Sequence, residues 1–224
     1  MGILTLANYR TEVQSALGDR GIGNTRLDQW INFGYLDLAG SVDFAVLDSN
    51  SSVNTINATQ TIAVASDAAV IKFIKDTTSD NLLAWIPTIE LMRREITPTA
   101  APLNWTREGN LIYLHPVPNG VYALSQFIKT PPTILSSSSA TSVFIATWDN
   151  AILTLAVHHA LLALGEEQRA TVWLSRAVSY IGSKITEADL HIGSAGLGAS
   201  LSTGFQNLQA RLAAAQLGMA GVEQ

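Results

Sequence analysis

Residues 104–135 read NWTREGNLIYLHPVPNGVYALSQFIKTPPTIL. Glu108–Asn110 and Pro118–Gly120 are turn signals, because Gly and Asn tolerate the positive φ angles of tight hairpins. Residues 111–115 and 121–129 are rich in β-branched, aromatic and aliphatic side chains, which favours strands. The prolines at 116, 118, 131 and 132 cannot donate to a sheet, so they mark strand ends. We therefore expect three short strands in a meander, with no catalytic group among them.

The region before this stretch is also β-rich. Residues 48–57 are polar and rich in Ser and Asn, which is typical of a loop or an exposed hairpin tip. Residues 59–64 and 70–75 read as two strands paired around a turn at 65–67. Pro87 fits the first turn of a short helix over 87–94, because its missing amide proton has no partner there.

Helical patterns occupy both ends of the chain. Apolar residues recur at helical spacing from Leu6 to Leu17, before Gly18, and again from about Thr25 to Gly40. Near the C-terminus, an apolar stripe runs from residue 148 to Gly165, and a second helix continues from 166 to about 191. The short turn between these two helices predicts an antiparallel hairpin.

The C-terminal segment differs from the rest. Residues 193–204 are mostly Gly, Ser and Ala, so they cannot form a core alone. They precede an amphipathic helix whose apolar positions are Phe205, Leu208, Leu212 and Leu217. Such a helix is most useful if it docks on another protein. The alternative is that it folds back on its own domain.

These patterns predict an α+β fold. We expect an antiparallel helical bundle, made of the N-terminal helix pair and the C-terminal hairpin, with a small antiparallel β subdomain inserted and an extended C-terminal tail. The expected ranges are 1–47 for the N-terminal helices, 48–145 for the β-rich insertion with its one short helix, 146–191 for the hairpin, and 192–224 for the tail with its docking helix.

Composition limits the function. Only 14% of the 224 residues are charged, where roughly 25% is usual, which suggests a surface covered by partners. The net charge of −5 argues against a dedicated nucleic-acid binder. The absence of cysteine excludes disulfides, thiolate catalysis and Cys-zinc sites. No apolar run approaches the roughly 20 residues that cross a bilayer, and residues 1–6 lack the charged start of a signal peptide, so we expect no membrane association and synthesis in the cytoplasm.

The candidate catalytic and metal-binding groups do not fit their chemistry. His158 and His159 are adjacent on a helix and point about 100° apart, whereas a metal pair needs a spacing of three or four. Glu166 and Glu167 share one short turn and cannot flank a glycosidic bond. The small basic group of Lys72, Lys75 and Arg93-Arg94 could contact DNA phosphates or an acidic partner surface, but a solvated face explains it better. We expect no enzymatic activity, and no catalytic, cofactor or metal site.

The order of elements resembles the head-to-tail connector, or adaptor, proteins of tailed bacteriophages. Three parts carry the resemblance. The first is the helix over 6–17, followed by Gly18-Asp19 and the helix containing 30–32. The second is the segment 108–135, with its Pro116-Val-Pro118 turn and with Pro131-Pro132 near its end, and the third is the helical hairpin, in which residues 162–165 precede Arg169-Ala170. Together they span about residues 5–190.

The resemblance implies a virion protein at the head–tail junction. It implies a dodecameric homo-oligomeric ring bound to the portal, with a tail or nozzle protein below it and genomic DNA passing through as a non-specific contact. Under this reading the aromatic side chains Trp105, Tyr113, Tyr122 and Phe127 are candidate subunit-interface anchors. The candidate portal-docking residues are Phe205, Leu208, Leu212 and Leu217. Two rival interpretations remain: a tail-completion or baseplate component, and a cell-wall-degrading enzyme or receptor-binding module.

Overall fold

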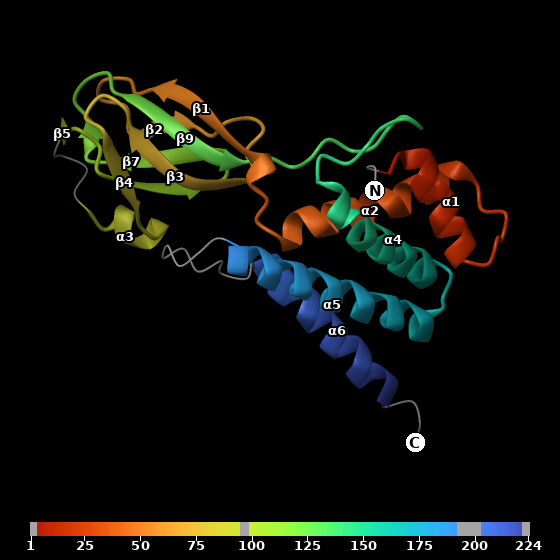
Figure 1. Ribbon diagram of the computed structural model, residues 1–224. Helices are drawn as coiled ribbons and strands as arrows, with labels where there is room; N and C mark the ends of the chain where they lie inside the picture. The colour runs from red at the N-terminus through yellow and green to blue at the C-terminus, as the bar shows by residue number, and fades with distance from the viewer. Residues whose placement is uncertain (1–3, 95–98, 192–202, 221–224) are drawn as a thin grey trace. The chain divides into compact units, whose positions relative to one another are not determined.

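The computed structural model describes residues 4–94, 99–191 and 203–220. The chain divides into two compact units (Figure 1). A helical unit comprises residues 1–46 and 132–224, and a β unit comprises residues 47–131. In the described part of the chain, no helix is both long enough and apolar enough to span a membrane.

In the part of the helical unit that the structure describes there are five α-helices, and a 3₁₀ turn at Ala146–Trp148 leads into the third of them. They are α1 (Leu6–Ala16), α2 (Asn24–Ser41), α4 (Asp149–Ala163), α5 (Glu167–His191) and α6 (Thr203–Ala220). Thr5 and Asn8 form a capping box that starts α1. Gly18 and Gly165 follow α1 and α4 with φ angles of 80° and 75°, which L side chains rarely adopt. The helices and stops predicted from the sequence are confirmed up to residue 191.

Helices α2 and α4 cross in close contact at Gly34. A Cβ atom at this position would lie 2.6 Å from the backbone nitrogen of Ala156 and 2.8 Å from the carbonyl oxygen of Ile152. Only a residue without a side chain allows the two backbones to approach so closely. Gly34 therefore sets the packing of the two helices at the centre of the unit.

The start of the chain is held against α4 by one buried carboxylate. Asp149 accepts a hydrogen bond from the Tyr9 hydroxyl at 2.6 Å and another from the Leu4 amide at 3.0 Å. Burial, reinforced by this hydrogen bond to Asp149, raises the pKa of the Tyr9 phenol well above its ordinary value. The pair ties α1 to the start of α4.

The described residues of the β unit form nine strands and one short helix, α3 (Thr88–Met92). The strands are β1 (Asp48–Asn54), β2 (Thr61–Ala63), β3 (Val70–Asp76), β4 (Asn81–Trp85), β5 (Thr99–Ala100), β6 (Asn104–Glu108), β7 (Leu111–His115), β8 (Val117–Pro118) and β9 (Ala123–Lys129). Seven of them form one sheet in the order β1-β9-β3-β4-β6-β7-β2, and β5 pairs with β8.

Strand pairing differs from the sequence expectation in three places. β6 and β7 form the predicted hairpin, with Glu108 opposite Leu111, but β9 pairs with β1 and β3 rather than with β7. β2 pairs with β7, so the two strands predicted to flank the turn at 65–67 are not partners. β1 is a strand where a loop or hairpin tip was expected. At each of these places, a strand pairs with a segment that is distant in the chain, and this pairing overrides the local sequence preference.

The expected fold class is therefore wrong. The β region is a large, nearly closed sheet of seven strands rather than a small antiparallel subdomain on a helical bundle, and it includes a parallel pairing of β4 with β6. The protein is a mixed α/β protein. The physical reason is that the polar strand β1 and the short strand β2 add to both edges of the sheet and enclose one core. Residues 192–202 and 221–224 of the expected extended tail lie outside the described residues.

A side chain bridges the sheet where its strands do not pair. Gln126 on β9 is buried, and its amide nitrogen donates to the carbonyl oxygen of Ala63 at 2.8 Å. Its amide oxygen accepts from the backbone nitrogen of Ala65 at 3.0 Å. One polar side chain thus closes the gap between β9 and the segment that contains β2.

Candidate interaction surfaces

The four aromatic residues predicted at subunit interfaces lie in different environments. Trp105 is only 4% exposed and belongs to the core of the β unit. Tyr113 and Tyr122 are half-buried, and the Tyr122 hydroxyl donates to Asn119. Phe127 is half-buried and stacks on Phe73, with 4.3 Å between ring centroids. Their role at an interface stays a prediction, and the structure gives Trp105 a core role.

The Phe73–Phe127 stack forms one apolar surface together with Leu82. Phe73 is 39% exposed and Leu82 is 65% exposed. The registers between β9, β3 and β4 place these residues on neighbouring strands of the same sheet. Lys72 and Lys75 on β3 form ion pairs with Asp48 on β1 and with Asp80 in the turn between β3 and β4. We call Phe73, Leu82 and Phe127 the sheet-face patch.

A second apolar surface surrounds α3. It consists of four large side chains, each more than half exposed: Trp85, Ile89, Met92 and Leu103. The Ala84 amide donates to the Leu103 carbonyl at 2.8 Å, and α3 contacts β6, so these residues lie in one region of the β unit. Exposed tryptophan is rare on surfaces that no partner covers, and it is common at binding hot spots. We call this group the α3 patch.

The helical unit also exposes apolar side chains beside a charged group. Phe33 and Leu36 on α2 and Leu162 on α4 are 51%, 37% and 44% exposed. The Phe33 ring meets the His159 ring edge-on at 5.7 Å. His159 Nε2 lies 2.8 Å from the carboxylate of Asp37.

Asp37 joins three helices through its carboxylate. It accepts a hydrogen bond from Arg211 on α6 at 3.1 Å as well as its contact with His159 on α4. Burial of the carboxylate acts to raise its pKa, but the hydrogen bonds from His159 and Arg211 outweigh it, so the pKa of Asp37 is lowered. Asp37 is therefore a charged anchor for α6.

The residues predicted to dock on a portal lie on α6, and α6 packs on its own unit. Phe205 and Leu208 are each 2% exposed, and the Phe205 ring lies against Gly182 of α5. Leu212 is half-buried, and the side chain of Leu217 lies outside the described residues. Portal docking stays a prediction, and the structure places Phe205 and Leu208 in the interior of the helical unit.

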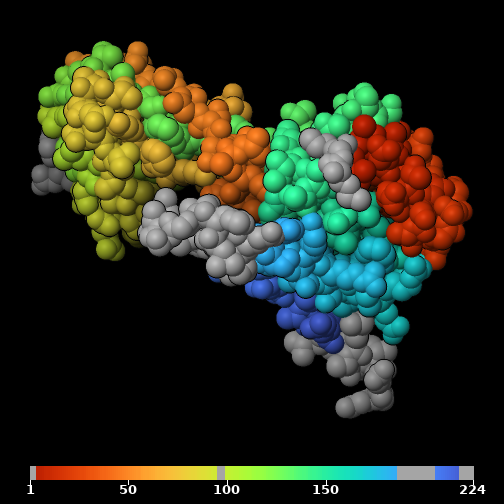
Figure 2. All heavy atoms as spheres, in the orientation of Figure 1, coloured from red at the N-terminus to blue at the C-terminus, as the bar shows by residue number. Residues whose placement is uncertain are grey.

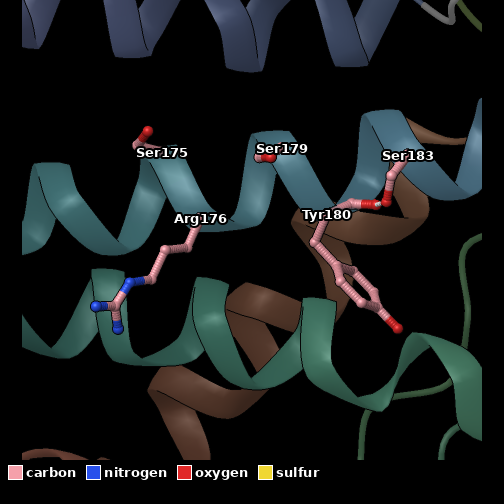
Figure 3. A pocket seen from close by; sticks show the side chains of 5 residues that line it. All are labelled: Ser175, Arg176, Ser179, Tyr180 and Ser183. Carbon is pink, nitrogen blue, oxygen red and sulfur yellow. Dashed lines mark hydrogen bonds between the residues drawn. The ribbon is translucent and has the colours of Figure 1, made fainter.

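A shallow groove follows α5 (Figure 3). It has a volume of about 490 Å³ and is lined by Ser175, Arg176, Ser179, Tyr180 and Ser183. The Tyr180 hydroxyl donates to the Thr147 carbonyl, and the Arg176 guanidinium lies over the Trp173 ring at 4.9 Å. These lining residues include no carboxylate and no histidine, so they offer no acid–base pair.

The two adjacent histidines have separate structural roles. His158 is buried with Nδ1 at 2.9 Å from the Ala170 carbonyl, and its Nε2 has no partner among the described residues. Burial lowers the pKa of His158, which favours the neutral ring. His159 contacts Asp37 instead. Within the described ranges, no group of three potential metal ligands occurs.

The basic group noted in the sequence is largely neutralised. Lys72 pairs with Asp48, Lys75 pairs with Asp80, and Arg94 pairs with Glu90. Arg93 is exposed. The interpretation as a solvated face fits these contacts better than a phosphate-binding patch does.

Sequence reasoning missed the exposed members of both patches of the β unit. Phe73, Trp85 and Ile89 lie in apolar segments that read as core, because apolar content does not tell which side of a sheet or helix is covered. A strand directs neighbouring side chains to opposite faces, so the adjacent Leu82 and Leu83 had to lie on different sides of β4; this is the signal that the sequence did contain.

Comparison with known proteins decides the family. The family model described as "SU10 adaptor protein" matches residues 4–197, which is nearly the whole chain. The chain belongs to the SU10 adaptor family. This is a family of phage head–tail adaptors, so the resemblance drawn from the sequence is confirmed. No curated protein matches the chain.

Membership in the SU10 adaptor family gives the protein a general role. SU10 adaptors are structural proteins of phages, which makes this chain a component of a phage particle. The apolar patches of the β unit agree with such a role, because large exposed apolar side chains mark surfaces that bind other proteins.

Proposed function

We propose that this SU10-family protein forms a ring at the head–tail junction, between the portal and the tail. The observation that carries the proposal is that the β unit exposes two groups of large apolar side chains, the sheet-face patch and the α3 patch. A closed ring needs two different surfaces on each subunit, because every interface joins one side of a subunit to the other side of its neighbour.

The charge of the protein supports a channel for DNA. A ring through which DNA passes must not hold the phosphates, and strong binding requires several unpaired Lys or Arg side chains. The chain has a net charge of −5. Lys72, Lys75 and Arg94 are already paired with carboxylates. DNA would therefore meet a surface that binds it weakly.

Portal docking through the C-terminal helix is part of the proposal. Because Phe205 and Leu208 are buried in their own unit, the portal would contact the remaining apolar positions of the helix, Leu212 and Leu217. Deletion of residues 192–224 should abolish portal binding, but it also removes two buried side chains. A sharper variant is Leu212→Ala with Leu217→Ala, which leaves Phe205 in place. Its matched control is Gln209→Ala, at an exposed position of the same helix.

Electron microscopy and co-sedimentation test the proposal. The purified protein is mixed with isolated portal rings, and we expect rings of the adaptor stacked on the portal and joint sedimentation. Trp85→Ala with Ile89→Ala should prevent ring formation if the α3 patch is a subunit interface. A protein that stays monomeric beside the portal, or that sediments only with tail structures, would contradict the proposal. The second outcome would favour a tail-completion component.

A further inference from the structure

The turn between β8 and β9 contains Asn119-Gly120, the one Asn-Gly pair in the chain. An asparagine that precedes glycine can react with its own backbone, because the glycine nitrogen can attack the carbonyl carbon of the asparagine side chain. Any other residue at the second position hinders this approach with its Cβ atom, which glycine lacks. The sequence therefore distinguishes Asn119 from the other asparagines of the chain as the candidate for this reaction.

The fold leaves the attacking nitrogen free. Within the described residues, no hydrogen bond uses the Gly120 amide. The groups on both sides of it are held, because the Asn119 amide donates to the Ala100 carbonyl at 3.3 Å and the Gly120 carbonyl accepts from the Thr55 hydroxyl at 3.0 Å. The backbone of the turn is thus fixed around an N–H group that no described acceptor occupies.

The side chain of Asn119 is exposed, and a neighbour polarises its carbonyl group. The Tyr122 hydroxyl donates to Asn119 Oδ1 at 2.5 Å. Negative charge develops on this oxygen when the Gly120 nitrogen attacks, so a donor already aimed at it stabilises the transition state, as in an oxyanion hole. In Figure 2, green atoms of the segment to which this turn belongs lie on the surface of the β unit, where water reaches them.

We propose that Asn119 is a self-modification site, which becomes aspartate or isoaspartate through a succinimide. Hydroxide removes the proton of the Gly120 amide, and the nitrogen forms a bond to Cγ of Asn119. The C–N bond of the side-chain amide breaks, and ammonia leaves with a proton from water. Water then opens the five-membered ring. Its attack at Cγ gives aspartate, and its attack at the main-chain carbonyl carbon gives isoaspartate.

The products differ from asparagine in charge and in backbone length. Each product adds one negative charge to a chain with a net charge of −5. Isoaspartate also lengthens the backbone by one methylene group, between the contact with Ala100 and the contact with Thr55. Thr55 accepts from the Tyr122 amide at 2.8 Å, so the change disturbs the contacts that hold the start of β9. The reaction needs only this chain and water, so it goes beyond the proposed ring and does not depend on it.

Mass spectrometry of the full-length protein tests the proposal. The protein is incubated in mildly alkaline buffer at physiological temperature and then digested with trypsin, which releases residues 108–129 as one peptide. This peptide also contains Asn110, an exposed asparagine that precedes leucine and serves as the internal control. We expect Asn119 to convert to a mixture of aspartate and isoaspartate, which electron-transfer fragmentation distinguishes, while Asn110 stays intact.

Two variants separate the nucleophile from the activating hydroxyl. Gly120 has no positive φ, and an added Cβ would lie 3.9 Å from the Tyr122 ring, so alanine fits. Gly120→Ala should lower the rate at least about tenfold. Tyr122→Phe removes the hydrogen bond to Asn119 and should lower the rate about two- to tenfold, the equivalent of one hydrogen bond. In guanidinium chloride, which removes the fold, Tyr122→Phe should react as fast as the parent.

Five outcomes would overturn the proposal. Three concern the parent protein: Asn119 keeps its amide, Asn110 converts as fast, or the product is aspartate alone, as direct hydrolysis would give. Two concern the variants: Gly120→Ala reacts like the parent, or folded Tyr122→Phe reacts at least as fast as the parent. Circular dichroism of both variants establishes that a lower rate does not come from a changed fold.

Discussion

The side-chain amide of Gln126 forms with Ala63 the hydrogen bond that a neighbouring strand would otherwise form, at 2.8 Å. A second hydrogen bond, from the Ala65 amide to the same side chain, completes the bridge. Both backbone groups depend on this one residue because the sheet does not pair across the gap.

Replacing Gln126 with methionine should strongly destabilise the β unit. The substitution keeps the size of the side chain but leaves the Ala63 carbonyl and the Ala65 amide unsatisfied, at a cost of about 1–3 kcal/mol for each group. Urea unfolding measures the change. Gln168→Met, at an exposed position, is the control and should shift the free energy of unfolding by less than about 0.5 kcal/mol. Equal effects of the two variants would show that the bridge does not stabilise the protein.

Gly34→Ala should destabilise the helical unit by about 3 kcal/mol or more. The new methyl group would lie 2.6 Å from the Ala156 nitrogen, and backbone atoms cannot move aside cheaply. Gly40→Ala on the same helix has no atom within 4 Å of the added Cβ, and it should stabilise the protein by about 0.5–1 kcal/mol through helix propensity. Chemical unfolding of both variants checks the opposite signs.

Tyr9 should make the protein less stable in alkaline solution. Its pKa is raised in the folded state, mainly by burial, so the folded protein keeps a neutral phenol while the unfolded chain ionises near the ordinary pKa of 10.0. Stability is unaffected below that pH and is lost above it, by up to about 1.4 kcal/mol per pH unit. Burial also raises the pKa of Tyr35, which adds to the loss.

Tyr9→Phe separates the two contributions. The variant should be less stable than the parent near neutral pH, because Asp149 loses a 2.6 Å hydrogen bond. Its stability should fall less steeply above about pH 10, with the remaining slope due to Tyr35. Unfolding free energies between about pH 8 and about pH 11 provide the measurement. Parallel profiles for parent and variant would mean that Tyr9 does not titrate with folding.

Phe205→Ala should cost about 3–5 kcal/mol, as expected of a buried aromatic ring, because Phe205 is 2% exposed against its own unit. Gln206→Ala, at the next and exposed position, should have little effect. Thermal or urea unfolding distinguishes them. If Phe205→Ala unfolds like the parent but fails to bind portal rings, then α6 is a docking element whose contact with its own unit does not stabilise the fold.

The helices were predictable because their signals are local. Thr5 and Asn8 lie within one turn, and the positive φ of Gly18 and Gly165 requires only the residue itself. The hairpin of β6 and β7 was predictable for the same reason, since Gly109 lies between the strands.

The sheet order was not predictable, because its partners are far apart in the chain. β1 is mostly Ser and Asn, so its propensity indicates a loop, and pairing with β9 overrides that preference. The apolar spacing of α6 indicates a buried side of the helix, and Phe205 and Leu208 are indeed buried. The spacing within one helix does not identify the surface against which it packs. The exposed Trp85 and Ile89 were missed because exposure depends on neighbours that only the fold supplies.

The chain enters and leaves the β unit at one point. The amide and the hydroxyl of Thr130 both donate to the carbonyl of Leu47, at 2.9 and 3.1 Å. A segment whose two ends meet can be removed, enlarged or replaced without stretching what flanks it. Residues 47–131 therefore meet the geometric condition for a replaceable insertion, because a change in their length need not pull the two flanking segments apart.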